Sequence, residues 1–247
     1  MVKGSPKNRQ EVPRMGNPTT LRAIQLVQLP YSVKPILDIT DSLLTSSTNP
    51  YKMRRFEDIT HISVHHSAVE GGTPEGYARA HVNTNGWGGI GYHIVIKGDQ
   101  IYQTNDLLTF SYHTSSNNAY TVGISVSGDL SKRNLTSQER ECLYAAIMTV
   151  RSIFNIPVEN VMGHNEYPNN NTACPCISMN QVRADLKDLD MKLKYMGSSE
   201  SKRKNAYAIA NQILYMYNMA QGSDGNAEWA LNKIIQLEPK MKELGLL

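Results

Sequence analysis

Residues 59–68 read Ile-Thr-His-Ile-Ser-Val-His-His-Ser-Ala, in which apolar and polar side chains alternate. In an extended chain Ile62 and Val64 point to one side, whereas Ser63 and His65 point to the other. The pattern predicts a β-strand with one apolar face and one polar face that carries histidine.

The histidines are confined to one part of the chain. All seven lie between residues 61 and 164, and the run Thr-Ala-Cys-Pro-Cys follows at residues 172–176. Histidine used only for packing would be scattered along the chain, whereas imidazole and thiolate are the usual ligands of zinc. The clustering therefore predicts a single His/Cys zinc site in the middle of the chain.

Four further segments have the pattern of strands. Residues 92–97 and 100–103 flank Gly98-Asp99, a pair that favours the tight turn of a β-hairpin. The other two expected strands are residues 122–127 and 158–162. Strands interleaved with helices predict an α/β fold, in which a central mixed β-sheet is flanked by helices.

Each of three expected helices begins at a capping signal. Thr73 precedes Pro74, and Thr136 is followed three residues later by Glu139 in a capping box. A second capping box begins at Ser178. The expected helices run from Thr73 to about Asn85, from Thr136 to Ile153 and from Ser178 to Gly197.

At 247 residues the chain is long enough for one α/β domain of about 150 residues and a smaller module. Residues 1–50 are rich in Pro, Ser, Thr and Asn and predict a largely irregular extension. A catalytic domain is expected at 51–197, a linker at 198–204 and a small C-terminal helical module at 205–247.

Composition narrows the class of protein. Three cysteines, two of them separated by a single residue, argue against a disulfide framework, and we expect neither a signal peptide nor a membrane span. Residues 61–190 carry eight basic and twelve acidic side chains, while both flanks are basic. A basic flank suits nucleic acid or an anionic cell-wall polymer equally well on composition alone.

A catalytic zinc site uses three protein ligands and keeps one position for water, whereas a structural site is closed by four ligands. His65 ends the first strand, His164 follows the strand expected at 158–162, and Cys174 precedes the last helix. These three are the candidate ligands. Adding Cys176 would close the set, so a structural zinc site remains the alternative.

Six short motifs occur in a characteristic order. They are Val64-His65-His66-Ser67-Ala68, Gly91-Tyr92-His93, Tyr112-His113-Thr114, Gly123-Ile124, Gly163-His164-Asn165-Glu166 and Thr172-Ala173-Cys174-Pro175. Over residues 55 to 195 the chain resembles the zinc-dependent N-acetylmuramoyl-L-alanine amidases, the family of phage lysozyme-type amidases and peptidoglycan recognition proteins.

The resemblance implies a role for each matching residue. It implies one zinc ion held by His65, His164 and Cys174, a catalytic Tyr92, and Thr172 at the second catalytic position. Phage lysozyme-type members have lysine at that second position, so Thr172 departs from them and agrees with the catalytic recognition proteins. The resemblance also places His113 along the substrate cleft.

The reaction implied is hydrolysis of the amide bond between N-acetylmuramic acid and L-alanine in peptidoglycan. An unperturbed tyrosine titrates near 10, so we favour Tyr92 as a hydrogen-bond donor and keep Glu166 as an alternative base. The other histidines, His61, His66, His81 and His93, are expected to serve packing or hydrogen bonding.

The leading hypothesis is a phage endolysin that is made in the cytoplasm, reaches the wall through a pore, and holds an anionic wall polymer with residues 205–247. A recognition protein that binds peptidoglycan without cleaving it is one alternative, although such binders typically lack the cysteine ligand. A regulator that binds another protein is the third hypothesis. Neither nucleic acid nor a membrane span is part of the leading interpretation.

Overall fold

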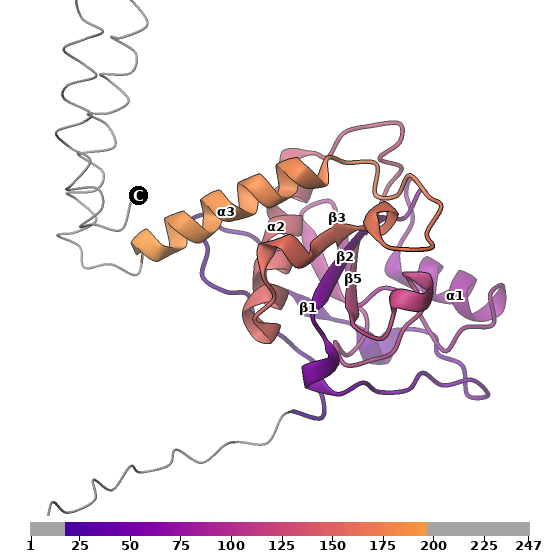
Figure 1. Ribbon diagram of the computed structural model, residues 1–247. Coiled ribbons are helices and arrows are strands. Elements are labelled where there is room, and N and C mark those ends of the chain that lie inside the picture. Colours follow the sequence, from indigo (N-terminus) through magenta and orange to yellow (C-terminus); the bar gives the residue numbers. More distant parts are fainter. Residues whose placement is uncertain (1–17, 197–247) are drawn as a thin grey trace, which may run out of the picture. The chain divides into compact units, whose positions relative to one another are not determined.

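A computed structural model describes residues 18–196 of the protein (Figure 1). Two compact units divide the chain: the first holds the residues up to Leu26 and Val33–Met179, and the second holds Val27–Ser32 and the residues from Asn180. The sheet and every candidate site residue belong to the first unit. The predicted linker and C-terminal module lie outside the described residues.

A six-stranded mixed sheet forms the centre of the first unit, which confirms the predicted fold class. Its strands are β1 (Leu37–Asp38), β2 (His61–His66), β3 (Ile94–Lys97), β4 (Gln100–Gln103), β5 (Thr121–Val126) and β6 (Val161–Gly163). The order across the sheet is β1-β4-β3-β5-β2-β6. Only the β3–β4 hairpin is antiparallel, and all other neighbours are parallel.

The helices begin where the capping signals predict. They are α1 (Pro74–Asn83), α2 (Ser137–Phe154) and α3 (Met179–Met196). The Thr73 hydroxyl accepts a hydrogen bond from the Gly76 amide, and Thr136 and Glu139 form the predicted capping box. None of the helices within residues 18–196 is long and apolar enough to cross a membrane.

The segment expected to be a strand at 158–162 is partly a turn. Val158–Asn160 forms the 3-10 turn η4, and β6 begins only at Val161. Pro157 has a fixed φ that suits the start of a turn. The Asn160 amide then donates to the Pro157 carbonyl at 3.0 Å and closes the turn. The prediction was therefore right about a strand here and wrong about its start.

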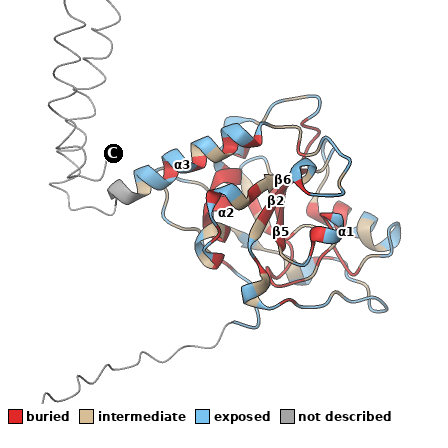
Figure 2. Cartoon of the chain, viewed as in Figure 1, coloured by how far each residue is buried: buried red, intermediate tan, exposed pale blue. Residues whose placement is uncertain are grey.

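The two faces of the sheet differ as the alternation predicts. Strand register sets Val64, Ile124 and Ile94 side by side, and all three are completely buried. The amphipathic helix α2 packs against β2, β3, β4 and β5 and contributes a long buried stripe (Figure 2). The apolar face of the sheet and α2 thus form the main hydrophobic core.

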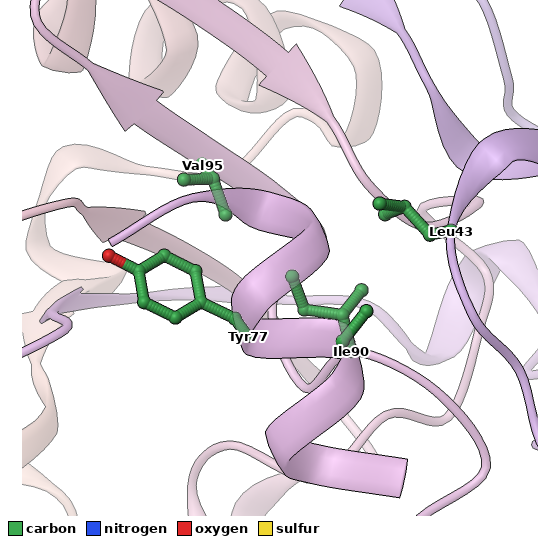
Figure 3. Packing of buried hydrophobic residues seen from close by; sticks show 5 residues of the cluster. Leu43, Tyr77, Ile90 and Val95 are labelled. Carbon is green, nitrogen blue, oxygen red and sulfur yellow. The ribbon is translucent and has the colours of Figure 1, made fainter. Parts of the chain in front are cut away.

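The opposite face carries the polar residues and is partly covered by α1. Tyr77 and Ala78 of α1 pack with Leu43, Ile90 and Val95 in a second buried cluster (Figure 3). Val95 is paired in register with Ser125, which is paired with His65. The sheet face that holds His65 is therefore covered by an apolar cluster over β3 and carries polar side chains over its other strands.

We expect Thr136→Ala to lower the free energy of unfolding by about 1 kcal/mol, because the α2 amide that Thr136 caps loses its partner. Urea denaturation measures the change. Thr136→Ser keeps the hydroxyl and should stay close to wild type; equal loss in both variants would show that the capping hydrogen bond is not the source.

Candidate metal centre

His65, His164 and Cys174 come together although they lie on three separate segments. One ligand atom from each lies within 4.8 Å of the others. Register explains the histidine pair: Val64 of β2 is paired with Gly163, the last residue of β6, so the residues that follow them, His65 and His164, lie side by side. The two imidazole rings are 4.6 Å apart.

His65 is held by hydrogen bonds on the side of its ring away from the group. Its Nε2 lies 2.9 Å from Ser63 Oγ and 3.2 Å from His113 Nδ1, while its Nδ1 faces Cys174 Sγ at 3.8 Å. With Nε2 donating, Nδ1 carries the free lone pair toward the group. Burial, reinforced by neighbouring histidines, holds the pKa of His65 well below its usual range, so the ring is neutral.

His164 is oriented in the same way by an amide. It opens the 3-10 turn η5 (His164–Glu166), and its Nε2 lies 2.9 Å from Asn170 Oδ1. Because that oxygen accepts, the ring hydrogen sits on Nε2 and leaves Nδ1 unprotonated. Burial lowers the pKa of His164, which favours the neutral ring.

Cys174 lies in the loop before α3, at half-buried depth. Its Sγ accepts a weak hydrogen bond from the His66 amide at 3.4 Å. Burial raises the pKa of the Cys174 thiol to about 11, so a thiolate at neutral pH calls for a cation beside it.

The donor set fits zinc. Tetrahedral zinc with ordinary Zn–N and Zn–S lengths holds a nitrogen and a sulfur ligand about 3.6 Å apart. His65 Nδ1 and Cys174 Sγ are separated by 3.8 Å. Two neutral imidazoles and one thiol, with the far nitrogen of each ring already hydrogen-bonded, match the first and second shells of a zinc site.

Cys176 lies outside this group. Its Sγ is 3.8 Å from His66 Nε2, and His66 Nδ1 accepts the Leu130 amide at 3.0 Å. The group of metal-binding side chains found in the described part of the chain has three members, without Cys176. This arrangement matches the open type of zinc site and not the closed type.

Tyr92 borders the group just before β3. Its ring centroid is 5.4 Å from that of His65. Burial raises the pKa of Tyr92 to about 12, with a further rise from Cys174, so the phenol keeps its proton at neutral pH. The nearby Ser125 hydroxyl opposes the rise. Within residues 18–196, the buried Ser125 Oγ has no hydrogen-bond partner of normal geometry.

His113 lies beneath the group and is buried. Its Nδ1 contacts His65 and also lies 2.6 Å from Thr114 Oγ1. Gly123 makes this position available, because a Cβ there would approach His113 Nδ1 to 2.7 Å. The structure thus gives His113 a contact with the candidate ligand His65; a role in substrate binding stays a prediction.

The remaining catalytic candidates lie around the rim. Thr172 is exposed, and its Oγ1 accepts from the Cys174 amide at 3.1 Å, so its own hydrogen is free to donate. The Glu166 carboxylate accepts from the Gly163 amide at 2.8 Å and closes the turn that begins with His164. This bond gives Glu166 a structural task at the candidate site.

Three histidines serve packing and hydrogen bonding. His93 is completely buried, and its Nδ1 accepts from the Gly123 amide at 2.9 Å. The Nδ1 of His81 accepts from Gly91 at 2.9 Å, and His61 lies partly exposed beside the Thr60 hydroxyl. Sequence reasoning did not identify Ser63 and Asn170; Ser63 shares the polar alternation of its strand, whereas Asn170 gives no comparable signal.

Comparisons with known proteins agree with this geometry. Residues 55–177 match the N-acetylmuramoyl-L-alanine amidase family. No curated protein matches the chain.

Solved structures show the same fold. The endolysine N-acetylmuramoyl-L-alanine amidase LysCS from Clostridium intestinale URNW is 23% identical, with a TM-score of 0.54 over 65% of this chain and 97% of that chain. LysC, another N-acetylmuramoyl-L-alanine amidase from that organism, is 24% identical, with a TM-score of 0.54 over 63% and 99%. Drosophila PGRP-LB is 22% identical, with a TM-score of 0.50 over 58% and 88%.

We expect Asn170→Ala to weaken zinc binding about 10- to 100-fold, because His164 loses the partner that orients its ring. Competition with a chromogenic chelator measures the affinity. Asn171→Ala alters a neighbouring exposed side chain and serves as the matched control. Equal affinities in the two variants would remove Asn170 from the site.

Proposed function

Through residues 55–177 this chain belongs to the N-acetylmuramoyl-L-alanine amidase family, and we propose that it is a zinc-dependent enzyme that cleaves bacterial peptidoglycan. The bond cut is the amide between N-acetylmuramic acid and L-alanine. The observation that carries the proposal is the three-membered group of His65, His164 and Cys174, which Cys176 does not close. The thiol in this group supports hydrolysis over a role in binding alone.

The metal and the residues around the candidate ligands have different roles in the proposed reaction. When bound, zinc supplies a Lewis acid that lowers the pKa of water and polarises the amide carbonyl. Ser63 and Asn170 keep the far nitrogens of His65 and His164 occupied, which fixes both rings before substrate arrives. Positions set in advance spare the site reorganisation during the reaction.

Tyr92 stabilises the charge that develops on the amide oxygen. A tyrosine phenol is neutral at physiological pH, and burial moves it further from ionisation by raising its pKa to about 12, so Tyr92 donates a hydrogen bond and is a poor general base. Thr172 offers a second, exposed hydroxyl on the loop that carries Cys174. A hydroxyl in place of a lysine provides a hydrogen bond without a full positive charge.

In its biological setting we propose that the protein is a phage endolysin. It would be made in the cytoplasm and reach the wall through a pore at the end of infection. Residues 205–247, beyond the predicted linker, would bind an anionic wall polymer. The endolysin among the solved structures of similar fold supports this setting.

The purified protein should contain one zinc per chain and release free amino termini from bacterial walls. A chelator should stop the release, and added zinc should restore it. Cys174→Ser should lose zinc and activity together, whereas Cys176→Ser, changed outside the group, should keep both. Full activity of zinc-free Cys174→Ser would refute the proposed metal site.

Tyr92→Phe should lower kcat about 100-fold or more and leave the zinc content unchanged, because it removes one hydrogen-bond donor from the oxyanion. Glu166→Gln serves as the comparison, since the alternative assigns the proton transfer to Glu166. We expect the smaller loss for Glu166→Gln. A larger loss there, with zinc retained, would reverse the two roles.

A further inference from the structure

Two thiols share one turn at the edge of the metal group. The Cys176 amide donates to the Ala173 carbonyl at 2.9 Å and closes the turn around Cys174. Both cysteines are free and half-buried, whereas Cys142 is buried in α2. Oxidants in solution therefore reach the pair more readily than the third cysteine.

The same residue, His66, contacts both sulfurs. Its backbone amide lies 3.4 Å from Cys174 Sγ, and its Nε2 lies 3.8 Å from Cys176 Sγ. Because His66 Nδ1 accepts the Leu130 amide, the ring hydrogen sits on Nε2 and faces the Cys176 sulfur. His66 thus contacts the first thiol through its backbone and the second through its ring.

Cys176 has a backbone conformation that disfavours a side chain. Its φ is +60°, in the left-handed region that glycine adopts without steric cost. The turn after Cys174 is therefore completed by a thiol at a position where glycine would be favoured.

We propose that Cys174 and Cys176 form a reversible oxidation site in which Cys176 is the resolving thiol. The inference rests on the proposed function in that Cys174 is taken as a zinc ligand. A peroxide is the oxidant: it oxidises Cys174 to a sulfenic acid and releases one water. The Cys176 sulfur then attacks that sulfur, an S–S bond forms, and a second water leaves. Overall, two thiols lose two electrons and two protons, and hydrogen peroxide becomes two waters.

The consequence for the metal follows from the charge on sulfur. A disulfide sulfur carries no negative charge, so Cys174 ceases to be a zinc ligand once the bond forms. A ring closed between residues two apart is strained, and strained disulfides are reduced easily. The pair would protect Cys174 from irreversible oxidation and allow zinc to be taken up again after reduction.

The test treats the full-length, zinc-loaded protein with hydrogen peroxide, blocks remaining thiols under denaturing conditions and digests with trypsin. Residues 152–183 form one tryptic peptide with both cysteines, and residues 141–151 form another with Cys142. We expect the first peptide to lose two hydrogens and take no label, while the second is labelled. A chelating dye should record zinc release in step with the disulfide.

Cys176→Ser supplies the matched control. In this variant peroxide should oxidise Cys174 further, to sulfinic or sulfonic acid, which dithiothreitol does not reduce. Dithiothreitol followed by zinc should therefore restore metal binding in the wild type but not in the variant. Equal recovery of both proteins, or labelling of both cysteines in the wild-type peptide after peroxide, would overturn the proposal. Two measurements separate a failure of this proposal from a failure of the proposed function. Absence of zinc from the protein before oxidation defeats the proposed function. Peptide mapping of chelator-treated protein shows whether the two thiols form a disulfide without metal.

Discussion

The parallel pairing of β2 with β5 on one side and β6 on the other is the constraint on which the rest of the structure depends. It places Val64 beside Ile124 in the core and, one residue later, His65 beside His164. A shift of one residue in this register would turn every side chain of β2 to the opposite face. The energy of the apolar face therefore also fixes the geometry of the polar one, and the candidate metal group uses a register that hydrophobic burial already determines.

A buried polar layer next to a hydrophobic core must have its hydrogen bonds satisfied, and Arg54 meets much of that need. The guanidinium is largely buried and donates to the carbonyl oxygens of Leu107, Asn118 and Thr121. Its Nη2 also lies 3.0 Å from Nε2 of His93. Burial lowers the pKa of Arg54 to about 10, yet the guanidinium stays charged at neutral pH. Burial first, and the Arg54 charge second, hold the pKa of His93 well below its usual range. The layer under the site is thus organised by one cation and neutral imidazoles.

Local sequence signals predicted most of the fold because they act over short distances. The capping residue Thr136, the turn at Gly98 and the alternation in β2 each determine their element without tertiary contacts. The three-membered group could be predicted because its donors are rare residue types, two at the ends of strands and one in the loop before α3. Asn170 could not, because the bond it makes to His164 depends on the path of a loop. The start of β6 was missed because Pro157 favours a turn that composition alone does not reveal.

Position, and not residue type, decides what each histidine does. His65 and His66 are neighbours in sequence, but strand alternation sends one ring to the metal group and the other to the Leu130 amide. In each ring, the hydrogen bond made by one nitrogen determines whether the other nitrogen accepts or donates. The free nitrogen of His65 faces a thiol as an acceptor, whereas the Nε2–H of His66 faces a thiol as a donor. The first arrangement suits a metal ligand, and the second suits a partner for sulfur. One turn of the chain, from Cys174 to Cys176, presents a thiol to each.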